Sequence, residues 1–314
     1  MRYLITGCFG FVGKYLVEAI QRAEPAAEII AIDRAPAPAS FPAVTRAHVL
    51  DLLDLALVSD VISREHPNRL VHLASLSSVG RSWQEPITSF TNNTNIFLNV
   101  LDCVRKHSPT TRVLSIGSSE QYGLVTESDL PLRETSPQRP LSPYAVARVA
   151  QEHLGEVYVR GYGLDIVATR SFNHLGAGQS SQFVISAIAK QFAELARGQR
   201  DRIRVGTTSV IRDFLDVRDV VAAYLALLAR GTTGEVYNIC NGRGLSIAEI
   251  IAMLADIAKV TPVIETDPEL VRPVENAVVV GDHTKITTAV GWQPTIALET
   301  ALRDVYDFWS RASF

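Results

Sequence analysis

Hydrophobic residues in the first two thirds of the chain form short, nearly continuous runs, and segments with helical periodicity separate them. One such segment, from Phe11 to Ala23, places Leu16, Val17 and Ile20 on a single helical face. Strands without strict apolar–polar alternation are typical of a parallel sheet that helices cover on both faces. The pattern therefore predicts an α/β fold with a doubly wound parallel sheet, whose ligands bind beyond the carboxyl ends of the strands. The expected strands are 2–7 (RYLITG), 28–33 (EIIAID), 46–51 (RAHVLD), 69–75 (RLVHLAS), 112–119 (RVLSIGSS) and 164–172 (LDIVATRSF).

The last third of the chain has a looser rhythm. Ser246 followed by Glu249 has the spacing of a capping box, which marks the start of a helix. We predict one domain over residues 1–172, with return segments at about 207–242, and a smaller, partly discontinuous α/β lobe that occupies mainly 173–314. The expected elements here are helices at 183–197, in the latter part of 210–230, at 245–258 and at 296–309, and strands at 203–206 and 234–240.

Composition and charge exclude several classes of protein. With 47% hydrophobic and 20% charged residues the chain is globular, and a net charge of −3 without a basic block argues against nucleic acid as a partner. Cys8, Cys103 and Cys240 are scattered, so neither a disulfide framework nor a metal site is expected. The N-terminal apolar run is too short for a signal peptide, and no run is long enough to span a membrane. We expect a cytoplasmic protein without a membrane partner.

A glycine motif follows the first expected strand. In TGCFGFVG, Gly7, Gly10 and Gly13 recur at intervals of three residues and lead into the first helix. Glycines in such a turn let backbone N–H groups approach a pyrophosphate at the positive end of a helix. The spacing alone is a weak signal, but Asp33 ends the second strand, roughly 20 residues further on, where an acidic residue binds the adenosine ribose. The first domain is therefore expected to bind a dinucleotide.

The residues beside this motif leave the choice of dinucleotide open. Asp33 favours NAD(H), because a carboxylate repels a 2′-phosphate, whereas the guanidinium of Arg34 could hold that phosphate and accept NADP(H). We favour NAD(H) slightly. Asp51 ends the third strand and is expected either to contact the adenine edge or to cap the following helix.

A second candidate site begins at SPYAVAR, residues 142–148. Ser142 can cap a helix and Pro143 suits its first turn, so Tyr144 and Arg148 lie one turn apart on the same face. Alone, such a pair is most often an ordinary solvated pair. The fifth strand, however, ends in Ser118, Ser119 and Glu120, at the edge of the sheet where the glycine loop also lies.

At these positions the chain resembles the extended short-chain dehydrogenase/reductase family, which has a Rossmann-type fold. Within this family it is most similar to bacterial GDP-4-keto-6-deoxy-D-mannose reductases, which are relatives of the GDP-mannose 4,6-dehydratases. The similar segments occur in the family's order over almost the whole chain. They are TGCFGFVG (6–13), HLAS (72–75), SSEQYG (118–123), SPYAVAR (142–148), RSFNHLGAGQ (170–179), RDFLDVRDV (212–220), YNICNG (237–242), LVRPVE (270–275) and GWQP (291–294).

The resemblance implies roles for the central residues. Tyr144 would be the general acid that protonates the oxygen of a sugar C4 ketone, and Ser118 would donate a hydrogen bond to that oxygen. A cation close to a phenol favours its ionised form, and the family normally places lysine at position 148. Arg148 keeps the charge, but its planar fork is bulkier and cannot relay a proton, so the exchange is not conservative.

Glu120 leaves the reaction open. In dehydratases of the family, a glutamate at this place eliminates water across C5 and C6, but related reductases also carry one. The dehydratase pattern usually has threonine where this chain has Ser118, which favours a reductase. As a simpler alternative, Glu120 only orients Tyr122 or its loop.

The resemblance also implies binding residues around these groups. On the substrate side, Arg212 and Arg272 would hold the diphosphate bidentately and Glu275 the ribose, although each could instead be a surface ion-pair partner. The expected cofactor contacts are Gly7, Phe9, Gly10, Phe11, Val12, Gly13, Asp33, Arg34, Asp51, Leu52, Leu73, Ala74, Ser75, Asn93, Tyr144, Arg148, Asn173 and His174. The expected substrate contacts are Ser118, Ser119, Asn173, Gln179, Phe183, Val184, Lys190, Arg212, Arg272 and Glu275.

Three functions follow as hypotheses. The first is reduction of GDP-4-keto-6-deoxy-D-mannose to GDP-D-rhamnose with NAD(P)H. The second is an NDP-sugar 4,6-dehydratase or 4-epimerase with tightly held NAD(P). The third, motivated by Arg148, is a non-catalytic nucleotide-sugar binding protein. By analogy with the family, a homodimer is expected to form through helices near residues 95–106 and 145–160.

Overall fold

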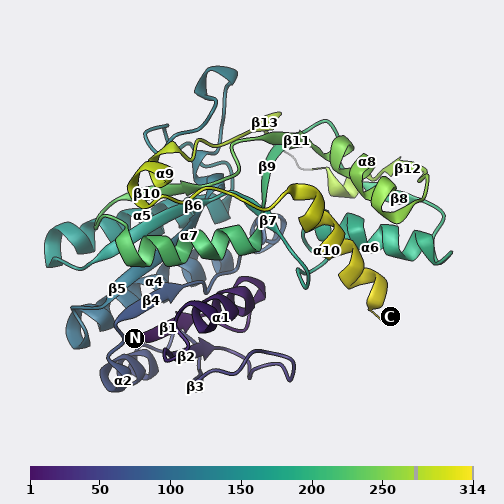
Figure 1. Cartoon of the computed structure of the whole chain (residues 1–314). Helices are drawn as coiled ribbons and strands as arrows, with labels where there is room; N and C mark the ends of the chain where they lie inside the picture. Colours follow the sequence, from purple (N-terminus) through teal and green to yellow (C-terminus); the bar gives the residue numbers. More distant parts are fainter. Residues whose placement is uncertain (272–274, 313–314) are drawn as a thin grey trace.

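The centre of the molecule is a seven-stranded sheet. The structure, a computed structural model, describes residues 1–271 and 275–312. The strands of this sheet are β1 (Arg2–Thr6), β2 (Glu28–Asp33), β3 (Arg46–Val49), β4 (Arg69–His72), β5 (Arg112–Ser118), β6 (Ile166–Ser171) and β10 (Val236–Ile239). Their order is β10-β6-β5-β4-β1-β2-β3 and every neighbouring pair is parallel (Figure 1). The predicted doubly wound α/β fold is confirmed.

Helices cover both faces of this sheet. One face is covered by α1 (Phe11–Ala23) and α7 (Val217–Arg230), and the other by α2 (Leu55–Glu65), α4 (Pro86–His107) and α5 (Pro143–Tyr162). Successive residues of β1 belong to different cores, because Ile5 packs on the α1 side and Leu4 on the α4 side. Burial on both faces explains why the strands lack apolar–polar alternation.

A smaller lobe lies to the right of the sheet in Figure 1. Its three helices enclose a separate hydrophobic core with the short parallel pair of strands. The helix α8 begins at the predicted capping box, in which Ser246 and Glu249 bond to each other's backbone N–H. The elements of the lobe are α6 (Val184–Ala196), α8 (Ile247–Ala258), α10 (Leu298–Arg311), β8 (Ile203–Val205) and β12 (Ile264–Thr266).

Several short elements were not predicted from the sequence. A small sheet combines β7 (Asn173–Leu175), β9 (Ile211–Asp216), β11 (Gly244–Ser246) and β13 (Val278–Val279), and β9 is its central strand. Most of these strands have two or three residues, too few to show a period of two. The others are α3 (Val79–Gln84), α9 (Thr284–Val290) and the single turns η1 (Ser119–Tyr122), η2 (Glu127–Asp129) and η3 (Pro268–Leu270). Among the helices of the described residues, none has the length and apolar character needed to cross a bilayer.

Candidate active site

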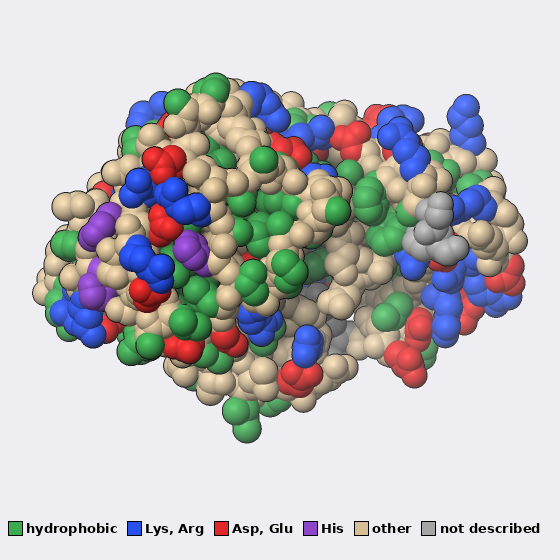
Figure 2. All heavy atoms as spheres, turned by 90° about the horizontal axis from the view of Figure 1, so that it is seen from below, with side chains coloured by type: hydrophobic (Ala, Val, Ile, Leu, Met, Phe, Trp, Pro, Cys, Tyr) green, Lys and Arg blue, Asp and Glu red, His purple; other side chains and the backbone are tan. Residues whose placement is uncertain are grey.

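A cleft of about 1150 Å³ lies at the carboxyl ends of β1, β4, β5 and β6. One wall is built from the loops that leave the sheet, and the other from β9 and the start of α6. Figure 2 shows the molecule hollowed between its larger part and the smaller lobe. Because ligand pockets commonly measure roughly 300–1,000 Å³, this cleft has room for a dinucleotide together with a second ligand.

The glycine loop forms the floor of the cleft beside β1. Gly7 has φ +65°, and a Cβ on it would lie 2.7 Å from the backbone of Ala74, while a Cβ on Gly13 would collide with the carbonyl of Cys8. Gly10 precedes α1 without a side-chain cap, so the N–H groups of the first turn remain available to an anion. The loop therefore has the backbone geometry of a pyrophosphate cradle.

Asp33 fixes this loop from the end of β2. Its carboxylate accepts hydrogen bonds from the backbone N–H of Phe9 at 2.9 Å and of Arg34 at 2.7 Å. Both Asp33 and Arg34 line the cleft. Asp51 also lines it and accepts from Leu53 N–H, whereas the cap of α2 is the neighbouring Asp54. Asp51 thus does not cap the helix itself.

Tyr144 and Arg148 lie side by side on α5, as the spacing predicts. Ser142 caps this helix by accepting from the N–H of Ala145 at 3.1 Å. Arg148 Nε donates to the hydroxyl of Tyr144 at 3.1 Å. The two side chains are only 6% and 4% exposed, yet both line the cleft. They are therefore shielded groups of the site rather than a solvated surface pair.

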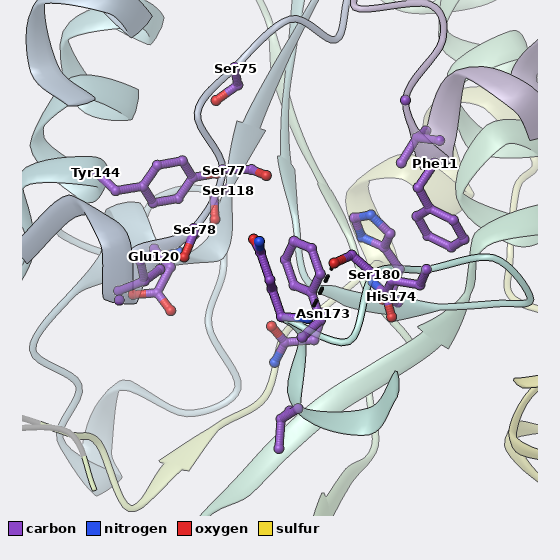
Figure 3. A pocket seen from close by; sticks show the side chains of 18 of the residues that line it. Phe11, Ser75, Ser77, Ser78, Ser118, Glu120, Tyr144, Asn173, His174 and Ser180 are labelled. Atoms are coloured by element: carbon purple, nitrogen blue, oxygen red, sulfur yellow. Dashed lines mark hydrogen bonds between the residues drawn. The ribbon is translucent and has the colours of Figure 1, made fainter. Parts of the chain in front are cut away.

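Ser118 faces the same space from the end of β5 (Figure 3). Its Oγ accepts from the N–H of Glu120 at 3.2 Å. A backbone N–H and a guanidinium N–H can only donate, so the hydroxyl oxygens of Ser118 and Tyr144 are both acceptors in these bonds. The proton of each hydroxyl is consequently free to be donated into the cleft. Glu120 lines the cleft next to them, whereas Ser119 lies outside its lining.

A network of buried polar side chains fixes the position of the Ser118 backbone. Gln121 accepts from the backbone N–H of Ser118 at 2.9 Å and donates to Glu152 of α5 at 2.7 Å. Glu152 forms an ion pair with Arg170 at 2.7 Å, in which both side chains are almost fully buried. Burial, the largest single influence, raises the pKa of Glu152, but the hydrogen bonds and charge of Arg170, together with hydrogen bonds from Gln121 and Gln138, outweigh it and hold this pKa below its usual range. The strand that carries Ser118 is thereby tied to the helix that carries Tyr144.

The loop after β4 forms a further wall and was only partly predicted. Asn93 lies outside the cleft lining and exchanges hydrogen bonds with the backbone of Leu76, at 2.8 Å and 3.1 Å. It therefore positions this loop. Ser77 and Ser78 line the cleft but were missed, although their place beyond the carboxyl end of a parallel strand could have indicated them.

The opposite side of the cleft is formed by the segment after β6. Asn173 and His174 line the cleft, and the ring of His174 stacks on Phe11 at 6.3 Å. Burial lowers the pKa of His174, although its bond to the carbonyl of Phe172 acts in the opposite direction. A neutral imidazole held in this way suits a packing role better than proton transfer.

At the lobe end of the cleft the guanidinium groups have acidic partners. Arg212 lies 3.2 Å from Glu275, and both line the cleft. Arg204, which sequence reasoning missed, also lines it and pairs with Asp267 at 3.3 Å. Lys190 lies outside the lining, 3.8 Å from Glu194, so this placement gives no support to its expected substrate contact. The expected Arg272 lies outside the described residues.

The structure thus brings most of the predicted residues to one cleft. Those that line it are Gly7, Phe9, Gly10, Phe11, Val12, Gly13, Asp33, Arg34, Asp51, Leu52, Leu73, Ala74, Ser75, Ser118, Glu120, Tyr144, Arg148, Asn173, His174, Gln179, Phe183, Val184, Arg212 and Glu275.

Known proteins share this sequence and this architecture. A family model described as GDP-mannose 4,6 dehydratase matches residues 4–305. The chain is 36% identical over 309 residues to the GDP-6-deoxy-D-mannose reductase of Pseudomonas aeruginosa, with 98% of this chain and 97% of that protein covered. The solved structure of the Pseudomonas aeruginosa protein RMD complexed with NADPH has a TM-score of 0.88 at 35% identity and covers 98% of both chains. The Thermus thermophilus UDP-glucose 4-epimerase complexed with NAD has a TM-score of 0.88 at 28% identity and covers 100% of both chains.

These similarities extend over the sheet, the lobe and the cleft between them. The chain therefore belongs to the GDP-mannose 4,6-dehydratase family, a group of NAD(P)-dependent nucleotide-sugar enzymes within the extended short-chain dehydrogenases/reductases.

Proposed function

We propose that this protein reduces the C4 ketone of GDP-4-keto-6-deoxy-D-mannose to give GDP-D-rhamnose, with NAD(P)H as the hydride donor. The observation that carries the proposal is the hydrogen-bond direction at Tyr144 and Ser118. Both hydroxyl oxygens accept from groups that can only donate, so both protons are available to one ketone oxygen. The near full-length similarity to a reductase of a GDP-sugar supports the same reaction.

The residues around the glycine loop fit a dinucleotide. The uncapped start of α1 would hold the pyrophosphate, and Asp33 and Arg34 lie where the adenosine ribose would be recognised. When bound, the reduced cofactor supplies a hydride to the ketone carbon. Asp33 already accepts two backbone hydrogen bonds, and Arg34 beside it is exposed and could hold a 2′-phosphate. Either NADPH or NADH could therefore be the hydride donor.

The chain's own residues handle the oxygen of the ketone. Ser118 donates a hydrogen bond to this oxygen and stabilises the negative charge that develops on it. Tyr144 then transfers its proton to the same oxygen, so that the carbonyl group becomes a secondary alcohol. Arg148 remains charged throughout, because a guanidinium does not lose its proton in proteins, and it stabilises the phenolate that is left.

The lobe end of the cleft would hold the nucleotide diphosphate. Arg212 and Arg204 present guanidinium groups there, and such groups match phosphate oxygens bidentately. We accordingly propose that residues 1–172, with return segments at about 207–242, bind the cofactor and that residues 173–314 mainly bind the nucleotide sugar.

A spectrophotometric assay tests the proposed reaction. We expect absorbance at 340 nm to fall when the keto sugar is added to the protein with NADPH or NADH, and GDP-D-rhamnose to be formed. GDP-mannose in place of the keto sugar is the control and should cause no loss of absorbance. If neither cofactor is consumed with the keto sugar, the proposed function is wrong.

A dehydratase or epimerase is the alternative, favoured by the position of Glu120 in the cleft and by the names of the family and of one structural relative. A product formed from GDP-mannose without added cofactor would support this alternative. Tight cofactor binding without turnover of any nucleotide sugar would instead indicate a binding protein.

We also propose that two copies associate through α4 and α5, which pack on each other and expose apolar side chains. Ile87 is 78% exposed on α4, and Val157 is 59% exposed on α5. Light scattering should give the mass of a dimer, and a charged substitution, Val157→Asp, should shift it towards the monomer. A monomeric wild-type protein would contradict this proposal.

A further inference from the structure

The guanidinium of Arg148 has a different set of partners on each side. Nε donates to the phenol of Tyr144 at 3.1 Å, and Nη1 donates to the carbonyl of Ile116 at 2.9 Å and to Gln151 Oε1 at 2.5 Å. Within the described residues Nη2 makes no hydrogen bond, and Arg148 lines the cleft. The planar group is therefore held through Nε and Nη1, and the two N–H groups of Nη2 remain for a ligand.

The amide of Gln151 is itself fixed in one orientation. Its Nε2 donates to Ser115 Oγ at 2.9 Å and to the carbonyl of Ile116 at 3.1 Å. Gln151 and Ser115 are 1% and 2% exposed, so water does not compete for these bonds. If the amide were turned over, its NH₂ group would face the guanidinium and two donors would oppose each other. The carbonyl of Ile116 can only accept a hydrogen bond, so it holds the amide nitrogen on its side and keeps Oε1 directed at Arg148, while Ser115 Oγ accepts a second bond from the same nitrogen.

We propose that Gln151 and Ser115 are positioning residues that form a socket specific for arginine at position 148, and that this socket aims the proton of Tyr144 into the cleft. The inference rests on the proposed reductase function for its kinetic consequences, but the socket itself is a property of the fold. It adds to that function a structural explanation for arginine, in place of the family's lysine, at position 148.

A lysine cannot use the socket in the same way. Its single ammonium nitrogen would have to reach the phenol of Tyr144, the carbonyl of Ile116 and the amide of Gln151 from one point. The guanidinium uses two nitrogens, Nε for the phenol and Nη1 for the carbonyl and the amide. With lysine in place, Gln151 Oε1 would be buried without its donor, and such an unsatisfied group is costly. The site is therefore adapted to arginine rather than impaired by it.

Arginine at position 148 fixes the direction of its hydrogen bond with Tyr144, and this affects catalysis. A neutral lysine amine could accept a proton from the phenol, but a guanidinium cannot accept one. With Arg148 clamped, the oxygen of Tyr144 is always the acceptor of that bond, and its own hydrogen points towards the ligand. This favours the phenol as a proton donor, which is the role that carbonyl reduction requires.

A double-mutant cycle tests the socket kinetically. We expect Gln151→Leu to lower kcat by about tenfold, the effect of one lost buried hydrogen bond, while KM for the keto sugar stays unchanged. Arg148→Lys should also lower kcat. Because Gln151 acts through Arg148, the double variant should be no slower than Arg148→Lys alone. Equal effects of Gln151→Leu in both backgrounds, or higher activity of Arg148→Lys than of the wild type, would overturn the proposal.

A milder pair of variants guards against misfolding. Ser115→Ala removes only one of the two acceptors that hold Gln151 Nε2, and we expect it to lower kcat several-fold. Ser108→Ala is the matched control, because it also removes a buried hydroxyl hydrogen bond, with Thr111 at 2.9 Å, at the other end of β5. Equal kcat for the two variants, after both show cooperative thermal unfolding, would count against the socket.

A spectroscopic readout separates the socket from the proposed function. In protein labelled with ¹⁵N-arginine, the clamped Nε–H of Arg148 should give a slowly exchanging resonance, assigned by its loss in Arg148→Lys. We expect this resonance to shift and to exchange faster in Gln151→Leu and Ser115→Ala but not in Ser108→Ala. If the resonance is the same in all of them, the socket is wrong, whatever the assay with the keto sugar shows. If the resonance responds but the keto sugar is not reduced, the socket stands and only the proposed function fails.

Discussion

The two ends of the cleft hold their arginine residues by different means. In the corner of the cleft lined by Ser118, Tyr144 and Arg148, which we call the catalytic corner, the hydrogen-bond partners of Arg148 among the described residues are neutral: a phenol, a carbonyl and an amide. Arg212, at the lobe end, forms an ion pair with Glu275 at 3.2 Å. The positive charge of the first is therefore available to the reacting groups, whereas that of the second is already balanced before a ligand binds.

This difference indicates what each end has to do. The catalytic corner needs a fixed geometry and a fixed charge, and these are best supplied by hydrogen bonds that do not change during the reaction. The lobe end needs to bind and release a diphosphate, and its arginines can exchange a carboxylate for a phosphate. We therefore expect substitutions in the catalytic corner to lower kcat and substitutions at the lobe end to raise KM.

The largest effect is expected for the phenol itself. Tyr144→Phe removes the proton donor, so kcat should fall by roughly 10²–10⁴-fold. Binding of NADPH, followed by its fluorescence, should change little. The matched control is Tyr158→Phe, a tyrosine on the same helix that is 8% exposed and outside the cleft lining, and it should retain full activity. Equal activity of the two variants would remove Tyr144 from the mechanism.

The next largest effect should appear in stability, at the network below Ser118. Glu152→Ala leaves Arg170 buried without its partner, and the free energy of unfolding in urea should fall by about 3–5 kcal/mol. Adding Arg170→Met should recover most of this loss, because the second buried charge is then removed as well. As a control, Glu299→Ala breaks an exposed ion pair with Arg303 and should cost less than about 1 kcal/mol. Similar losses in both single variants would show that burial is not the cause.

A smaller effect, and of another kind, is expected at the lobe end. Arg212→Ala removes a charge-assisted contact to the diphosphate worth about 1.5–3 kcal/mol, so KM for the nucleotide sugar should rise by roughly 10- to 150-fold. The value of kcat should stay close to that of the wild type. Glu275→Gln removes the ion pair with Arg212 and should lower KM if the carboxylate acts only as a competitor of phosphate. If Arg212→Ala instead lowers kcat and leaves KM unchanged, the lobe end does not differ from the catalytic corner in the way proposed here.

The smallest effect concerns His72, which reports on the charge of the catalytic corner. Burial, with a further contribution from the positive charge of Arg148, lowers the pKa of His72 from 6.5 to about 3. The unfolded chain therefore takes up a proton near pH 6.5 that the folded protein refuses, and stability from this group is lost as the pH falls from 6.5 towards 3.

Urea titrations at pH 7.5 and pH 5.5 measure this contribution. The free energy of unfolding of the wild type should fall by about 1 kcal/mol more than that of His72→Gln over this range. The same slope in both proteins would mean that His72 is charged in the folded state. The corner would then tolerate a second positive charge next to Arg148.

The sequence alone determined the central sheet and the floor of the cleft. Continuous apolar strands, the helix at Phe11–Ala23 and the glycine loop depend on neighbours in the chain, and their periodicity and spacing are visible in the sequence. The pairing of Tyr144 with Arg148 was equally predictable, because residues one helical turn apart are always neighbours. The parallel topology then placed Ser118 and the glycine loop at the same edge of the sheet.

Only the tertiary structure decided which partners these groups have. Gln151 follows Arg148 by three residues on α5, so these two are neighbours by spacing, but Ser115 comes from β5, and nothing in the sequence shows that it meets Gln151. Arg204 was not singled out in the sequence, and it is β8 that brings this residue to the cleft. Lys190 was expected to contact the substrate, but it lies outside the cleft lining and pairs with Glu194 one turn further along α6. Local periodicity fixes which face of an element is buried. Which polar groups meet across that face depends on how distant elements pack, and this is not written in any short stretch of the chain.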